Sequence, residues 1–317
     1  MSGYIGKNAA QKEFVKLFDT LTGAHSRWEV WKDMVVLFAT AISNSVDKRY
    51  WDEREKLYLE TIRRYTKEQQ NKFCELLTML TLTMETEAQD KEFSDFLGEL
   101  FMQLNLGNDA GGQFFTPYHV CELMARISMD KDTLKAQIEE NGYITVNDCA
   151  CGAGATLIAA AEVMWQWDIN YQQTAIFTAQ DIDYTTALMC YVQLSLIGCA
   201  GYVRIGNTIA DPMTGSILHG GNNDRNTWYT PMWFSGTWTM RRELDKIKRM
   251  VSAVATACAD EEKPAPVDNM PMEKAPVKPN KRPPVKTRKT EAEERPKEPE
   301  ETEITYTVMK NGQLSLF

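Results

Sequence analysis

Residues 146–157 constrain the fold of this chain more than any other part of its sequence. The β-branched residues at 144–146 are typical of a short buried strand. Gly152 and Gly154 then allow a tight turn, and residues 155–167 have the composition of a helix. A strand, a glycine-rich turn and a helix in this order predict the unit that receives the adenosine part of a cofactor in doubly wound α/β folds.

The turn differs from the dinucleotide fingerprint G-x-G-x-x-G/A, because Leu157 stands where the third glycine would be. Asp148, directly before the turn, would repel a phosphate but suits a cation. S-adenosylmethionine (SAM) carries a sulfonium and an ammonium group and has no phosphate. The spacing alone fits a nucleotide site, a SAM site or an ordinary βα turn.

Two neighbouring motifs favour the SAM site. Residues 112–117 read G-Q-F-F-T-P, and residues 179–183 read A-Q-D-I-D. Together with D-C-A-C-G-A-G at 148–154, they resemble the modification subunits of type I restriction systems and related adenine-specific DNA methyltransferases. That family reads G-x-F-x-T-P, then D-P-x-C-G-S-G, then an acidic residue after the second strand. The resemblance covers roughly residues 97–212 and implies methyl transfer from SAM to the exocyclic amine of adenine in DNA.

The resemblance also implies which residues bind SAM. Asp181 would accept hydrogen bonds from the ribose hydroxyls, although an acid favoured by a helix N-terminus is the alternative. Thr116 and Pro117 would belong to a loop over the cofactor, or would serve as the N-cap and first residue of a helix. Asn207 replaces the usual Asp near the adenine. The full predicted set is Phe115, Thr116, Pro117, Asp148, Cys151, Gly152, Gly154, Asp181, Ile182 and Asn207.

The resemblance fails at the catalytic motif, which in this family is Asn, Asp or Ser, then Pro-Pro, then an aromatic residue. Its oxygen atoms accept hydrogen bonds from the target amine, and its ring stacks on the flipped base. No such motif follows the third predicted strand. The nearest candidates are D-P-M at 211–213 and T-P-M-W at 230–233, and the second keeps both a proline and an aromatic residue. Thr230, Pro231 and Trp233 are therefore the predicted catalytic residues, and a packed turn is the alternative.

The predicted fold is α/β, with a Rossmann-like SAM-dependent methyltransferase domain at 108–258. An α-helical domain at 1–107 precedes it, because apolar residues recur there at helical spacing. Six basic residues of this helical region would form a DNA-facing surface or an ordinary solvated one: Arg49, Arg54, Lys56, Arg63, Arg64 and Lys67.

A charged, proline-rich linker at 259–303 follows, with nine of the chain's twelve prolines, and its composition predicts disorder. Residues 274–289 carry seven positive charges and no negative one, which suits either DNA contact or a solubilising linker. The remaining segment, 304–317, ends in Q-L-S-L-F, which resembles the peptide that binds the bacterial sliding clamp. Its predicted contact residues are Gln313, Leu314, Leu316 and Phe317.

Composition limits the function further. A net charge of −9 argues against DNA binding by overall charge, so a local basic surface would be needed. Seven cysteines without a C-x-x-C spacing, and three histidines, predict no metal site. No secretory signal or membrane span is expected, and the predicted location is the cytoplasm. The expected partners are DNA, the sliding clamp and a possible specificity subunit; the alternatives are a catalytically inactive SAM-fold protein recruited to the clamp, and a subunit active only with its specificity partner.

Overall fold

The computed structural model describes residues 9–106, 115–220, 225–261 and 313–315. The chain divides into two compact units, residues 1–245 with 306–317, and residues 246–305. In the second unit, the described part is helical and covers residues 246–261. The predicted disordered linker at 259–303 is wrong for its first three residues, because the helix continues through 259–261, and the rest of the linker lies outside the described residues.

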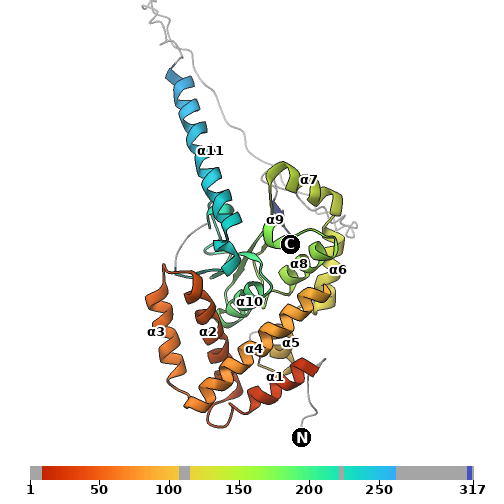
Figure 1. The fold of residues 1–317 in the computed structure, drawn as a ribbon, viewed down its shortest axis with the longest axis vertical. Coiled ribbons are helices and arrows are strands. Elements are labelled where there is room, and N and C mark those ends of the chain that lie inside the picture. Colours follow the sequence, from red (N-terminus) through yellow and green to blue (C-terminus); the bar gives the residue numbers. More distant parts are fainter. Residues whose placement is uncertain (1–8, 107–114, 221–224, 262–312, 316–317) are drawn as a thin grey trace, which may run out of the picture. The chain divides into compact units, whose positions relative to one another are not determined.

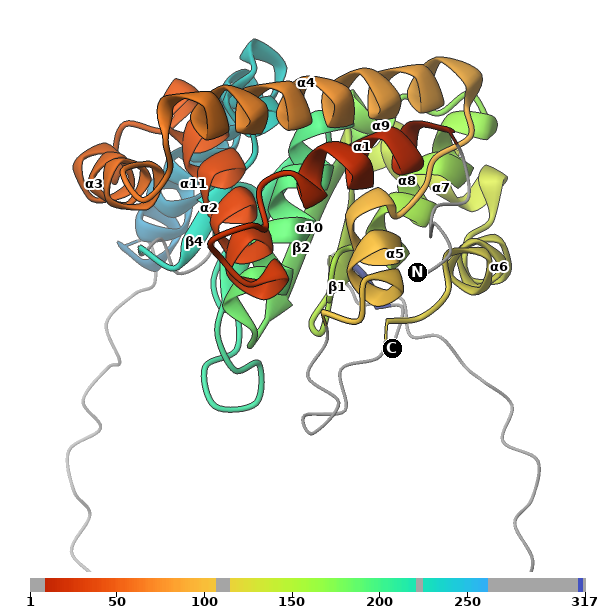
Figure 2. The same cartoon turned by 90° about the horizontal axis from the view of Figure 1, so that it is seen from below.

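The first unit begins with helices whose apolar stripes are buried, as the sequence predicts. A capping box precedes the longest of these helices: the Thr66 side chain accepts from the Gln69 amide, and the Gln69 side chain accepts from the Thr66 amide. Figure 2 shows the long helix α4 extending across α1. The helices are α1 (Ala9–Asp19), α2 (Arg27–Val46), α3 (Trp51–Ile62), α4 (Lys67–Asp90) and α5 (Phe96–Gln103).

The sheet has five strands in the order β4-β3-β2-β1-β5. Strands β1 (Ile144–Asp148), β2 (Ala175–Asp181) and β3 (Ala200–Ile205) are parallel and confirm the predicted strands. At one edge β4 (Thr227–Tyr229) pairs antiparallel with β3. At the other edge the C-terminal strand β5 (Gln313–Ser315) pairs parallel with β1 from Thr145 to Asn147.

One face of the sheet is covered by the helices that follow β1 and β2. Because β1, β2 and β3 are added in one direction and such crossovers are right-handed, α8 (Ala155–Gln166) and α10 (Tyr184–Leu196) lie on the same face. The N-terminal helices pack outside them, and Figure 1 shows α10 beside α2 and α4. A single hydrophobic core therefore runs from Phe14 in α1 to Val203 in β3.

The other face of the sheet carries a smaller aromatic cluster. Ile176 and Tyr202 point to this face and pack with Trp233 and Trp238, both buried. Trp233 belongs to η3 (Pro231–Phe234), and Trp238 belongs to the start of α11 (Gly236–Glu261). Leu218, from η2 (Ile217–His219), is also part of the cluster. The remaining helices are α6 (Tyr118–Ser128), α7 (Lys131–Asn141) and α9 (Tyr171–Thr174).

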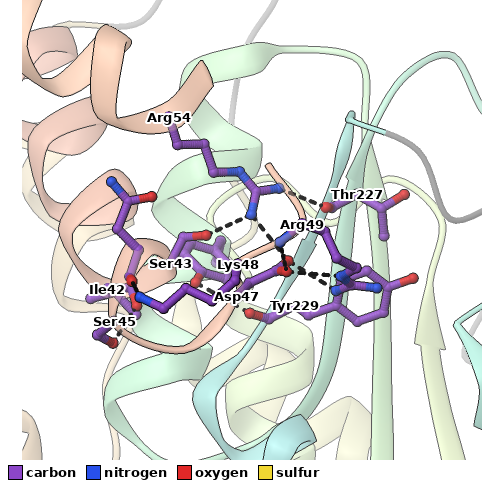
Figure 3. A network of polar contacts seen from close by, with 11 residues as sticks. Ile42, Ser43, Ser45, Asp47, Lys48, Arg49, Arg54, Thr227 and Tyr229 are labelled. Carbon is purple, nitrogen blue, oxygen red and sulfur yellow. Dashed lines mark hydrogen bonds and ion pairs between the residues drawn. The ribbon is translucent and has the colours of Figure 1, made fainter. Parts of the chain in front are cut away.

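A buried polar network joins the N-terminal helices to the sheet (Figure 3). The guanidinium of Arg54, in α3, donates to Ser43 Oγ at 2.6 Å, to Asp47 Oδ2 at 3.2 Å and to the carbonyl of Thr227, in β4, at 3.0 Å. It also lies 4.2 Å from the ring centroid of Trp228. Asp47 is 1% exposed and accepts from Arg49 as well. Two helices and one strand thus share a single hydrogen-bonded cluster.

This network corrects the predicted basic surface. Arg54 is 3% exposed, Arg49 is paired with Asp47, and Arg64 is paired with Asp33. These three arginines pair with aspartates of the same chain and so stabilise the helical region. The sequence pattern did not predict these pairs. Lys56, another of the six residues, forms a solvent-exposed ion pair with Glu60.

Candidate functional site

The turn between β1 and α8 depends on two glycines. Gly152 and Gly154 have φ of +51° and +99°, a region that other residues rarely adopt. A Cβ at Gly154 would lie 2.9 Å from Sγ of Cys190, and a Cβ at Gly152 would lie 3.3 Å from the ring of Phe115. The predicted strand–turn–helix unit is confirmed, and its backbone packs closely on α10 and Phe115.

Asp148 ends β1 and is 2% exposed. Its carboxylate accepts from the Ala150 amide at 3.0 Å and from the Thr156 hydroxyl. Burial raises the pKa of Asp148; the two hydrogen bonds counteract the shift in part, and the nearby charge of Asp181 adds to it. A bound cation would relieve this unfavourable desolvation, so Asp148 suits a cationic ligand as the sequence predicts.

Asp181 ends β2 and holds the turns after β1 and β2 together. Its Oδ2 accepts from the Gly152 amide at 2.8 Å, and its Oδ1 accepts from the Asp183 amide at 2.9 Å. The N-cap of α10 is Asp183, which accepts from the Thr186 amide at 2.8 Å, so capping does not account for Asp181. The following side chain, Ile182, is 69% exposed at the same edge of the sheet.

The loop after β3 reaches the same edge. Asn207 is exposed, and its Oδ1 accepts from the amides of Ile209 and Ala210 at 2.9 and 3.2 Å. The hydroxyl of Thr208 donates to the carbonyl of Cys149 in the glycine turn. The structure thus gathers Asp148, Asp181 and Asn207 at the carboxyl ends of three neighbouring parallel strands, where such sheets bind ligands.

A pocket of about 100 Å³ opens beside the glycine turn. Small-molecule pockets span roughly 300–1,000 Å³, so this one holds a single end of a cofactor. Phe115 forms part of its wall and stacks on Phe101 with ring centroids 5.4 Å apart. The lining residues are Asp95, Phe115, Thr116, Cys121, Asp148, Ala150, Cys151, Gly152, Ala153, Ala155 and Thr156.

Thr116 and Pro117 precede α6 but do not start it as the sequence suggests. The helix begins at Tyr118, its N-cap is Pro117, and no side chain caps it. Thr116 is exposed and lines the pocket, so its position agrees with the loop interpretation and excludes the N-cap one. The beginning of this motif, residues 112–114, lies outside the described residues.

Sequence reasoning missed Asp95 and Gln193, which support the pocket from behind. Asp95 caps α5 by accepting from the Gly98 amide at 3.0 Å. The fully buried Gln193 donates to Asp95 at 2.7 Å and to the carbonyl of Ala153 at 2.9 Å. An Asp before the apolar run of α5 was a readable N-cap signal; a glutamine within an apolar helix gave none.

Cys151 lies in the glycine turn, and its surroundings give it a structural role. It is 5% exposed, and its hydrogen bond with Cys190 and its burial raise its pKa well above the ordinary value for a thiol. The thiol is therefore neutral and unreactive at neutral pH. Among the described residues, no group of three or more His, Cys, Asp or Glu side chains could hold a metal ion.

The predicted catalytic residues lie elsewhere. Thr230 is fully buried; its hydroxyl donates to the carbonyl of Cys199 at 2.7 Å and accepts from the Gly201 amide at 3.0 Å. Pro231 begins η3, and Trp233 is 4% exposed against Tyr229, with ring centroids 5.2 Å apart. The structure gives the packed-turn alternative its support and gives the catalytic role none.

Their position explains why. Gly201 is near the amino end of β3, whereas Asp148 and Asp181 lie at the carboxyl ends of β1 and β2. Thr230 lies opposite Gly201, three strand spacings across the sheet from β1 and two residue positions before the level of Asp148. At about 4.8 Å between strands and about 3.3 Å per residue, this is roughly 14 Å across the sheet and about 7 Å along it. A Pro-aromatic pair in the sequence therefore does not locate a target-base pocket here.

Fold and site together define a class of protein: an α/β protein with an acidic site, suited to a cationic cofactor, at the carboxyl edge of its parallel strands. In the part of the chain that the structure describes, no helix is both long and apolar enough to cross a membrane.

Comparison with known proteins gives the family. The model of the N-6 DNA Methylase family matches residues 91–258, more than half of the chain, so the chain belongs to this family. Its cofactor is S-adenosylmethionine, which the acidic, phosphate-excluding site fits.

Individual relatives are more distant. The Type I restriction enzyme MpnII methylase subunit of Mycoplasma pneumoniae is 30% identical over 132 residues, which is 39% of this chain and 22% of that protein. The chain thus spans about a fifth of the length of this relative.

Two solved structures are also similar. A Listeria monocytogenes protein described as a class I S-adenosylmethionine-dependent methyltransferase has a TM-score of 0.36 and 15% identity, over 67% of this chain and 57% of that one. The type I restriction-modification system methyltransferase subunit of Streptococcus thermophilus has a TM-score of 0.33 and 16% identity, over 67% and 42% of the chains.

Proposed function

We propose that this chain is a SAM-dependent methyltransferase that acts on the exocyclic amine of adenine in DNA. The observation that carries the proposal is the acidic carboxyl edge of the sheet, where Asp148 and Asp181 flank the glycine turn. The family match supports the nature of the reaction, because it covers all the residues of this edge.

Each predicted residue has a role that its surroundings allow. Asp148 and the small pocket would receive the cationic methionine end of SAM. Asp181 keeps lone pairs beyond its two backbone hydrogen bonds, since a carboxylate has about four acceptor positions, and would accept from the ribose. The exposed Ile182 would pack on the adenine ring, with Asn207 at its polar edge.

The target adenine needs groups that hold it beside the methyl group of SAM. Its amine nitrogen must approach the methyl carbon of SAM in line with the departing sulfur, held by hydrogen-bond acceptors while an aromatic ring stacks on the base. The buried Thr230 and Trp233 leave that task open.

This favours a second candidate, a subunit that is active only with its specificity partner. The outer edge of β1 supports this second candidate, because only part of the edge is paired among the described residues. Three residues of β5 pair there with this five-residue strand. A partner chain could bring the missing base-holding groups to this side of the cofactor site. The third reading, a catalytically inactive SAM-fold protein, predicts cofactor binding without transfer.

The C-terminal peptide would recruit the enzyme to the sliding clamp. Gln313 and Leu314 belong to β5, and Leu316 and Phe317 lie outside the described residues. A flexible chain of the length of residues 262–312 spans roughly 40 Å root-mean-square, enough to place a clamp beside the folded unit. Clamp binding would require β5 to leave the edge of β1.

The experiment that tests the main proposal measures transfer of a labelled methyl group from SAM to unmethylated bacterial DNA. We expect label in N6-methyladenine, either from the purified chain alone or after addition of its specificity partner. Calorimetry with SAM separates the alternatives: binding without transfer under both conditions identifies the inactive protein, and absence of binding overturns the proposed site.

Clamp recruitment is tested by deleting residues 313–317. We expect loss of binding to a purified bacterial clamp with SAM affinity retained. Clamp affinity that survives the deletion contradicts the assignment of Gln313, Leu314, Leu316 and Phe317.

A further inference from the structure

The first part of helix α11, residues 236–245, belongs to the first unit and packs within it through one face. Trp238 is fully buried and donates from Nε1 to the carbonyl of Gln172 at 2.8 Å. Arg242 donates to the carbonyl of Trp233 at 2.8 Å, and Asp245 lies 2.9 Å from Nε2 of His219. At 3.6 residues per turn, positions 238, 242 and 245 lie on one side of the helix.

The opposite side of α11 is an exposed apolar stripe. Met240 is 60% exposed, Leu244 49%, Ile247 57% and Val251 65%. These four residues are about half a turn away from the anchored side. The anchored side accounts for the packing of α11 on its own chain, so the stripe needs another explanation: solvent-exposed apolar rows of this length are characteristic of binding surfaces.

The spacing of the stripe is that of a coiled coil. The intervals between these residues are four, three and four, and the sequence continues the pattern with Val254 and Cys258. Leu244, Val251 and Cys258 occupy the heptad positions a, and Met240, Ile247 and Val254 occupy the positions d. Figure 1 shows α11 as one continuous helix over this range.

The charges beside the stripe distinguish the possible partners. Glu243 is at position g and Lys248 at position e, five residues later. In a parallel pair of identical helices, g of one helix faces e of the next heptad of the other, so Glu243 faces Lys248 in both directions. In an antiparallel pair, Lys248 would instead approach Arg241 at another e position, which is repulsive.

We propose that the stripe of Met240, Leu244, Ile247 and Val251 binds the same stripe of a second copy of this chain, as a parallel coiled coil. Its core has β-branched residues at both a and d rather than Leu at d, a pattern compatible with more than two helices. With fewer than three full heptads the association is weak, and it depends on protein concentration.

Sedimentation equilibrium of the full chain tests the proposal, at concentrations from about 1 to 100 µM so that mass action is visible. We expect an average mass that rises from one copy to two or more, and a return to one copy in Ile247→Glu. The matched control is Ile127→Glu, which places the same charge at a residue 72% exposed in α6 and leaves association unchanged. A single-copy mass throughout this range overturns the proposal.

Charge reversal tests the parallel direction. We expect Glu243→Lys and Lys248→Glu each to weaken association several-fold and the double variant to restore it, because the pairs are then reversed but complementary. If the double variant is as weak as the single ones, the pairing is not parallel. Cosedimentation with anionic lipid vesicles adds a further outcome: a chain that is a single copy in solution and binds vesicles through Ile247 has a membrane-binding stripe, and the proposal fails.

Discussion

Asp47 and Asp148 are equally buried carboxylates with opposite properties. Burial raises the pKa of Asp47, but the hydrogen bonds and charge of Arg49, with the charge of Arg54, outweigh it and leave the pKa lowered. Burial also raises the pKa of Asp148; its partners are a hydroxyl and an amide, and the pKa stays raised. Asp47 has its counter-charges within the fold, whereas Asp148 would gain one from a ligand. We therefore assign Asp47 to stability and propose that Asp148 serves binding.

The largest expected effect is on the internal pair. Arg54→Ala leaves the buried Asp47 with Arg49 as its partner and removes the link to the Thr227 carbonyl, so we expect a loss of about 3–5 kcal/mol of unfolding free energy. Urea denaturation at neutral pH measures it. Lys56→Ala, on the exposed side of the same helix, changes stability by less than about 0.5 kcal/mol.

If Arg54→Ala loses no more unfolding free energy than Lys56→Ala, Asp47 needs no counter-charge within the fold, and the contrast with Asp148 fails. SAM affinity of the folded variant stays unchanged, because Arg54 joins α3 to β4 at the sheet edge farthest from β1.

At Asp148 the effects are reversed. Asp148→Asn keeps the shape and one acceptor oxygen but removes the charge, so we expect SAM affinity to fall about 10–100-fold, the equivalent of ~1.5–3 kcal/mol for a charged hydrogen bond. Unfolding free energy is unchanged or increases, since a raised carboxylate pKa opposes folding above it. Calorimetry and thermal melting measure the two quantities.

The control for Asp148→Asn is Asp132→Asn, at an exposed position in the first turn of α7, with wild-type SAM affinity expected. A variant Asp148→Asn that binds SAM normally but melts early would assign this carboxylate to the same structural role as Asp47.

The contrast also explains what the sequence could predict. Local patterns located the first strand, the glycine turn and the helix after it, because the residues at 144–157 are contiguous in the chain. The resemblance placed Asp148, Asp181 and Asn207, and parallel strands bring such residues to one edge automatically.

These local patterns could not predict contacts between residues that are far apart in the sequence. Arg54 meets the Thr227 carbonyl across 173 positions of sequence, and Gln193 meets Asp95 across 98. The same limit misplaced Thr230: its residue type and neighbours suggested a catalytic loop, whereas the antiparallel direction of β4 carries it to the amino end of β3.

Thr230 gives a smaller and sharper test. Thr230→Val is nearly isosteric and leaves the carbonyl of Cys199 and the amide of Gly201 without their hydroxyl partner, so we expect a loss of about 1–3 kcal/mol of stability. SAM affinity and any methyl transfer, measured per folded molecule, stay at the wild-type level. A large loss of transfer with normal stability and SAM affinity would restore the catalytic interpretation.

Glu87, a partly buried carboxylate in α4, extends the comparison to pH. Burial raises its pKa to about 7, although Ser94 donates to it at 2.8 Å. Between about pH 4.5 and 7 the folded chain keeps a proton that the unfolded chain releases, so this group makes unfolding free energy fall as pH rises.

Glu87→Gln removes the contribution, and we expect the variant to gain on the order of 1 kcal/mol over wild type between pH 4.5 and 8, after solvent screening of the ~1.4 kcal/mol per pKa unit. Urea denaturation at both pH values, with the exposed Glu85→Gln in the same helix as control, measures the difference. An equal pH dependence in all three proteins would show that Glu87 is ionised in the fold and belongs with Asp47 rather than with Asp148.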